Sequence, residues 1–142
     1  MRILLAVNPL VTRTALRMFL QEEPGMQVVS EVNRVGELMR EVLFTHPDLV
    51  IMDWNLPGIN SYEQRGLGAG TPTRRPNQLK AVVISSLHHI TPNPFILVLC
   101  SQPEDSIPAL FAGADAFIYQ GDSPKLLIDL LRTIERSVQS QH

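Results

Sequence analysis

Short apolar runs alternate along the chain with segments in which apolar residues recur at helical spacing. The apolar runs are brief and rich in Val, Ile and Leu, as expected of strands that are buried on both faces. They are Ile3–Val7, Gln27–Val32, Asp48–Met52, Phe95–Cys100 and Ala116–Tyr119. Because strands that alternate with helices form parallel sheets, this pattern predicts an α/β fold with helices on both faces of a five-stranded sheet.

The intervening segments have the periodicity of amphipathic helices. The predicted helices are residues 10–21, 35–44 and 78–90 and the stretch after Ser123. Ser123 can cap that last helix, and Pro124 suits its first turn. Residues 78–90 contain Val82-Val83-Ile84, which would also fit a strand, and we interpret the segment as a helix.

Residues 58–77 interrupt this rhythm. They contain four glycines and two prolines and have almost no apolar periodicity. Loops of this length are uncommon in compact domains and are usually either functional or disordered. We therefore predict a flexible loop insertion within a single domain that spans residues 1–142.

Composition narrows the class of protein. A chain of 142 residues with 44% hydrophobic residues is sufficient for one domain with a substantial core. The net charge of -2, with acids and bases mixed, provides no basic stripe, so we expect no direct binding of nucleic acid. No apolar run is long enough for a membrane span or a signal peptide core. Cys100 is the one cysteine, which fits a reducing compartment and favours a cytoplasmic location.

Two motifs carry a resemblance to a known family. Residues 47–58, which read PDLVIMDWNLPG, resemble the third strand and following loop of bacterial response-regulator receiver domains, the CheY-like family. Residues 112–117, AGADAF, are similar to the turn that leads into the fifth strand of that family. The opening residues 4–11 are similar to receivers of LuxR-type regulators. The resemblance covers nearly the whole chain apart from residues 58–77, and it implies a three-layer, flavodoxin-like fold with strand order 2-1-3-4-5.

The resemblance assigns the role of phosphoacceptor to Asp53. A carboxylate that attacks a phosphoryl group needs its charge neutralised by a metal ion or by fixed cations. Receivers hold Mg²⁺ with two acids at the end of strand one, the acceptor aspartate and a backbone carbonyl, which here would belong to Asn55. A hydroxyl residue that ends strand four and a lysine that ends strand five contact the phosphoryl oxygens.

Most of these groups are replaced in this chain. The acid positions fall on Ala6 and Val7, or on Val7 and Asn8 if one residue is deleted before the following proline. The hydroxyl position falls on Cys100, although Ser101 would serve if the register shifts by one, and the lysine position falls on Gln120.

These replacements remove the main electrostatic contributions to catalysis, because a close charge pair near a protein surface is worth about 4 kcal/mol before solvation costs. We therefore expect weak or absent Mg²⁺ binding and no other cofactor. Asp53 becomes a vestigial or low-activity phosphoacceptor, which can accept hydrogen bonds from Asn8 or Gln120.

Three further residues bear on signalling. Phe117 falls at the position of the aromatic switch of receivers, and Trp54, next to Asp53, is interpreted as an exposed contact residue. Pro108 would disrupt the helix after strand four, so we expect that helix to begin near residue 106.

The leading hypothesis is a regulatory module of a two-component, or phosphorelay, system, not an enzyme, that works through protein contacts. The expected partner is a histidine kinase, an output domain or another regulator. A homodimer would form through helix four, which begins near residue 106, strand five, Ala116–Tyr119, and helix five, which follows Ser123. One alternative is a conventional response regulator that is phosphorylated on Asp53. Another is a small-molecule binder at the carboxyl ends of the strands.

Overall fold

The computed structural model describes residues 1–58 and 76–140, which contain one five-stranded parallel sheet. The strand order is β2-β1-β3-β4-β5, so the predicted fold class and strand order are confirmed. The strands are β1 (Arg2–Ala6), β2 (Gln27–Val32), β3 (Leu49–Asp53), β4 (Phe95–Cys100) and β5 (Ala116–Tyr119). Three of them have the predicted bounds, and β1 and β3 are each displaced by one residue.

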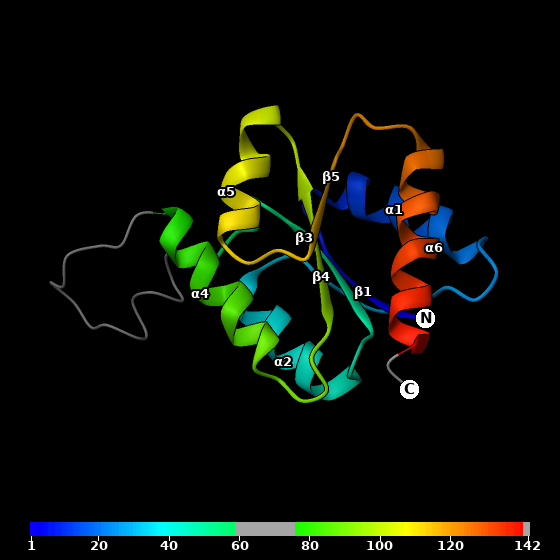
Figure 1. Cartoon of the computed structure of the whole chain (residues 1–142), viewed down its shortest axis with the longest axis horizontal. Helices are drawn as coiled ribbons and strands as arrows, with labels where there is room; N and C mark the ends of the chain where they lie inside the picture. The colour runs from blue at the N-terminus through cyan, green and yellow to red at the C-terminus, as the bar shows by residue number, and fades with distance from the viewer. Residues whose placement is uncertain (59–75, 141–142) are drawn as a thin grey trace, which may run out of the picture.

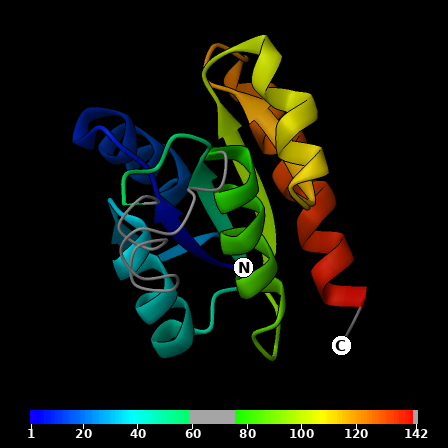
Figure 2. The same ribbon diagram turned by 90° about the vertical axis from the view of Figure 1, so that its left-hand side faces the viewer.

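Helices cover both faces of this sheet. They are α1 (Leu10–Gln21), α2 (Val35–Thr45), α4 (Pro76–His88), α5 (Ser106–Phe111) and α6 (Pro124–Ser140), with a 3₁₀ turn, η1 (Pro103–Asp105), before α5. Figure 1 shows α1 and α6 on one face and α2, α4 and α5 on the other. In Figure 2, α4 lies between α2 and α5, and it contacts both.

The predicted loop insertion at residues 58–77 lies largely outside the described residues. Its last two residues belong to α4, which begins at Pro76 and not at Gln78 as predicted, and which ends at His88 and not at Ile90. Proline is favoured at the first position of a helix because its missing N–H needs no partner there. At the other end of the segment, Gly58 has a φ of 101°, and a Cβ at this position would lie 3.2 Å from the Val35 nitrogen.

Alternate strand residues supply two separate cores. The core under α2, α4 and α5 contains Leu4, Val50 and Val98, and the core under α1 and α6 contains Ile3 and Ile51. Among the described residues, no helix is long and apolar enough to cross a membrane. β3 is the central strand, flanked by β1 and β4, and the candidate site lies at its carboxyl end.

Candidate functional site

Asp53 is the last residue of β3 and is 5% exposed. Its Oδ1 accepts a hydrogen bond from the Asn55 backbone N–H at 3.0 Å, and the backbone of Asn8 supplies a second hydrogen bond. Burial nevertheless raises the pKa of Asp53, because the loss of hydration outweighs these hydrogen bonds and the attraction of Lys80. The structure therefore holds this carboxylate in an environment that disfavours its charge.

Trp54 is buried, with an exposed fraction of 2%, so the prediction of an exposed contact residue is wrong. The physical reason is that the alternation of β3 continues past Asp53. Val50, Met52 and Trp54 all belong to the core under α2, α4 and α5. The backbone N–H of Trp54 also donates a hydrogen bond to the Leu99 carbonyl at 2.9 Å, which holds this part of the backbone against β4.

Lys80, which is not among the predicted site residues, enters the same pocket from α4. Its exposed fraction is 8%, and its Nζ lies 4.2 Å from the centroid of the Trp54 ring. The Nζ also donates a hydrogen bond to Asn55 Oδ1 at 3.3 Å. Burial lowers the pKa of Lys80, whereas the charges of Asp105 and Asp53 raise it. The pocket thus contains a cation that comes from a helix and not from the end of strand five.

A signal for Lys80 exists in the sequence. Lys80, Val83, Ile84 and Leu87 follow the i, i+3, i+4, i+7 spacing of a buried helical face. The three apolar members of this set are completely buried. A lysine at the first position of such a pattern lies on the buried face of the helix and needs a polar or charged partner there, since buried lysines are nearly always paired.

Asp105 is a second carboxylate of this pocket. It lies in η1, directly before α5, and its Oδ2 is buried without a hydrogen-bond partner within residues 1–58 and 76–140. Its side chain makes no capping hydrogen bond to α5. Its charge acts on Asp53, Lys80 and Cys100, so the side chain contributes to the electrostatics of the pocket and not to the helix.

The residue at the hydroxyl position, Cys100, is completely buried at the end of β4. Burial, followed by the charges of Asp105 and Asp53, raises the pKa of its thiol to about 11. The neighbouring Ser101 is exposed. A thiol that stays protonated at neutral pH is a poor nucleophile, and this favours the interpretation of Cys100 as a small core residue.

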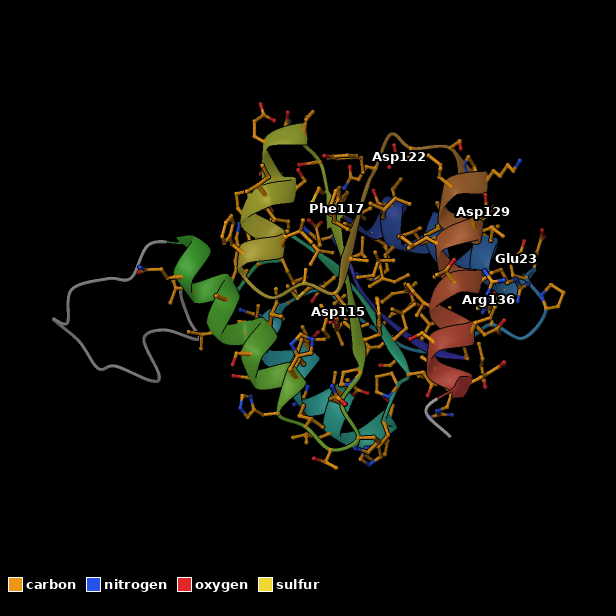
Figure 3. All side chains as sticks on the ribbon, in the orientation of Figure 1. Glu23, Asp115, Phe117, Asp122, Asp129 and Arg136 are labelled. Carbon is orange, nitrogen blue, oxygen red and sulfur yellow. The ribbon has the colours of Figure 1, made fainter. Side chains whose placement is uncertain are left out.

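The other predicted pocket residues are distributed around the carboxyl ends of the strands. Val7 is buried in the core under α1 and α6, and Asn8 is exposed. The Gln120 N–H donates to the Cys100 carbonyl at 2.9 Å, and the residue lines a cavity on the α1 and α6 side of the sheet. Phe117, labelled in Figure 3, packs against the core under α4 and α5. Its ring lies edge to face with the ring of Tyr119, and the two ring centroids are 5.5 Å apart.

The cavity beside Gln120 has a volume of about 330 Å³. Its lining combines apolar and polar side chains of both helices and the sheet, and it includes Leu16, Phe19, Leu127, Thr12 and Asp122. Figure 3 shows Asp122 just beyond β5, at the end of the strand opposite to Asp115. Pockets for small molecules begin at about this size and often lie at the carboxyl ends of parallel strands.

The helix that carries Lys80 is anchored at its far end. His88, the last residue of α4, places its Nε2 2.8 Å from the Oδ2 of Asp115. The same oxygen accepts the Ile96 N–H at 2.8 Å, so Asp115 ties α4 to the start of β4 as well as to β5. These contacts fix the end of α4, which favours a defined position for Lys80.

The residues around Asp53 do not fit an Mg²⁺ ion. Such an ion prefers octahedral oxygen ligands, with one or two carboxylates close together. Ala6 and Val7 are completely buried apolar residues, and Asn8, at the alternative acid position, is exposed and uncharged. The Lys80 ammonium lies next to Asn55 in the same pocket. Among the described residues, no group of three or more His, Cys, Asp or Glu side chains could hold a metal ion.

Comparison with known proteins yields one curated relative and many solved structures. No protein-family model matches the chain. The uncharacterized transcriptional regulatory protein YhcZ of Bacillus subtilis (strain 168) is 28% identical over 128 residues, which are 90% of this chain and 52% of YhcZ. The chain therefore spans about half the length of this relative.

The solved structures share the fold at low sequence identity. The response regulatory domain of mrkE from Klebsiella pneumoniae has a TM-score of 0.74 at 12% identity, with 99% of each chain covered. A LuxR-family two-component response regulator from Aurantimonas sp. SI85-9A1 has a TM-score of 0.68 at 23% identity, with 98% of this chain and 85% of that chain covered. With the strand order and the position of Asp53, these similarities establish that the chain has the CheY-like fold of response-regulator receiver domains.

Proposed function

We propose that this chain is a receiver-like module of a two-component signalling system, which acts by contacts with other proteins and without the usual Mg²⁺-dependent phosphorylation. One observation supports the proposal: the positions where receivers place metal-binding acids fall on Ala6 and Val7, or on Val7 and Asn8, and none of these residues is a carboxylate. Without those acids, no Mg²⁺ ion is held beside Asp53 to neutralise the charge of an incoming phosphoryl group. The module is then a regulator and not an enzyme, and residues 1–142 act as one domain in the cytoplasm.

The surface around α5 supports a role in protein contacts. Ile107, Leu110 and Phe111 of α5 are 63%, 47% and 87% exposed, and Leu126 at the start of α6 is 54% exposed. Exposed apolar groups of this kind, when they gather on one face, mark interaction sites. We propose that the face of α5, β5 and α6 binds a second copy of the chain or another protein, such as a histidine kinase or an output domain. The description of YhcZ as a transcriptional regulatory protein, about twice as long, is consistent with an output domain.

The fluorescence of Trp54 provides the test, because this is the one tryptophan in the chain and it follows Asp53 directly. The protein is titrated with Mg²⁺ to about ten millimolar, with and without beryllofluoride as a phosphate mimic, in parallel with Asp53→Asn. We expect no saturable change in emission. A saturable response at low millimolar Mg²⁺ that is lost in Asp53→Asn would establish the conventional phosphorylated regulator instead.

A second candidate function is supported by the cavity between α1 and α6. Its volume of about 330 Å³ and its apolar walls fit a small organic molecule. A ligand that binds the folded state alone raises the melting temperature with concentration, so thermal shift measurements against nucleotides and second messengers test this function. A concentration-dependent rise that is abolished by Leu16→Trp, which would fill the cavity, would favour the binder over the protein-contact module.

A further inference from the structure

The arrangement around Lys80 is unusual for a surface helix. A lysine side chain normally keeps its ammonium in water, and full burial is rare without a partner. Here the Lys80 residue as a whole is only 8% exposed. Its ammonium faces the Trp54 ring at 4.2 Å and the Asn55 side-chain oxygen at 3.3 Å. Both of these partners are neutral, so they do not balance the charge.

The charges that can balance Lys80 come from two separate elements. Asp53 ends β3, and Asp105 lies in η1 immediately before α5. Both carboxylates favour the charged form of Lys80, with Asp105 the larger of the two contributions. The Oδ2 of Asp105 is buried and accepts no hydrogen bond in the described part of the chain. Such a buried oxygen is costly unless a positive charge lies nearby.

We propose that the Lys80 ammonium is the resident cation of this pocket, which supplies from α4 the positive charge that Asp53 and Asp105 share. This inference deepens the proposed function and rests on it, because a pocket with its own cation needs none from solvent. Lys80 is here a positioning residue. Its charge acts on Asp53 at the end of β3 and on Asp105 in the segment that leads into α5.

This connection has a consequence for the contact face. Asp105 directly precedes α5, and α5 carries Ile107, Leu110 and Phe111 as exposed apolar residues. When the charge of Lys80 is lost, Asp105 keeps a buried oxygen with no positive charge beside it, and η1 can relieve this by moving toward water. The charge of Lys80 therefore stabilises the observed position of the proposed contact face.

The competing interpretation is that Lys80 contributes only its apolar stem. In that case the four methylenes pack on Trp54 and the ammonium is incidental. Lys80→Met separates the two interpretations, because methionine retains a flexible apolar side chain of similar length and lacks the charge. Lys125, which is exposed on α6, offers a matched control for the substitution.

The experiment is a pair of double-mutant cycles on the full chain. The melting temperatures of Lys80→Met, Asp53→Asn, Asp105→Asn and the two double variants that contain Lys80→Met are measured by circular dichroism. We expect Lys80→Met to lower the melting temperature by several degrees. Asp53→Asn and Asp105→Asn should each change the melting temperature more favourably, by a larger rise or a smaller fall, in the Lys80→Met background than in the wild type. Lys125→Met should leave the melting temperature unchanged.

Two outcomes would overturn the proposal. One is a melting temperature of Lys80→Met within error of the wild type, and the other is additivity in both cycles. If Lys80→Met does not fold, the double variant with Asp53→Asn or that with Asp105→Asn must fold, and failure of both also refutes the proposal. Hydrogen exchange of residues 106–111 supplies a second measurement, since Lys80→Met should accelerate exchange there and Lys125→Met should not.

The outcome is independent of the Mg²⁺ titration. Coupling between Lys80 and the two carboxylates together with a response to Mg²⁺ would reject the proposed function and retain the resident cation. A flat titration without coupling would retain the proposed function and reject the resident cation.

Discussion

Replacement of Trp54 by alanine tests the packing on which the whole pocket depends. The ring is 2% exposed and belongs to the core under α4. A tryptophan buries about 150–250 Å², which at about 25 cal/mol per Å² corresponds to about 4–6 kcal/mol as an upper estimate. Truncations of buried aromatic residues cost about 3–5 kcal/mol, and loss of the contact with Lys80 adds about 1 kcal/mol. We expect Trp54→Ala to lower the free energy of unfolding by about 4 kcal/mol.

This loss is large compared with the whole stability of a domain, which is about 5–15 kcal/mol. It corresponds to a fall in melting temperature of about 10 °C or more. The assay is urea unfolding followed by circular dichroism at equilibrium, because the variant no longer contains a tryptophan. Phe44→Ala is the matched control, since Phe44 is 82% exposed, and its effect should stay within about 0.5 kcal/mol.

A loss below about 1 kcal/mol for Trp54→Ala, similar to that of Phe44→Ala, would refute this reasoning. It would mean that the indole is exposed in solution, as the sequence alone suggested. The surface on which Lys80 packs would then be absent, and the burial of the ammonium would have no structural basis.

Three further predictions concern the charge, the thiol and the contact face. Asp53→Asn should raise the melting temperature at pH 7, because burial raises the pKa of Asp53 above its ordinary 3.8 and the ionised form then costs stability; the gain should vanish as the pH falls below that value, and a gain that grows in acid would contradict the sign. Cys100, with a pKa of about 11 against an ordinary 9.0, has about 100-fold less thiolate near pH 8, so Ellman's reagent should react quickly only after unfolding, and rapid labelling of the native protein would disprove its burial. Phe111→Ser should change the free energy of unfolding by less than about 0.5 kcal/mol and weaken self-association in light scattering over a concentration series, whereas equal association of variant and wild type would exclude this residue from the interface.

The strands and most helices could be predicted because their signals are local. β2, β4 and β5 have the expected bounds, since each is a short apolar run between polar or turn-forming residues. The bounds of α1 also agree, and α5 begins at the predicted Ser106. α4 begins two residues before its predicted start, because Pro76 resembles the preceding loop in composition and yet occupies the first position of the helix.

The pocket was less predictable, because its members meet only in the folded chain. Trp54 follows a strand end, and its direction depends on whether the alternation of β3 continues, which the sequence does not state. Lys80 lies 27 residues after Asp53, and Asp105 lies beyond the next strand. The motifs of the family place the lysine at the end of strand five, so they do not predict a lysine on a helix.

The same replacements that remove the metal-binding acids also account for the need for Lys80. The positions at which the resemblance to receivers places acids fall on Ala6 and Val7, or on Val7 and Asn8, which are uncharged, and Asp53 is 5% exposed. A buried carboxylate requires hydrogen bonds and a countercharge, and two backbone hydrogen bonds do not offset its loss of hydration. Lys80 provides the countercharge from a side chain that cannot diffuse away, unlike a bound ion. Under the proposed function, the charge of the pocket does not depend on metal ions or phosphoryl groups, and a partner acts through the positions of α4 and α5. A partner that binds the exposed residues of α5 would change the position of α5 directly, and this is the mode of regulation that we propose.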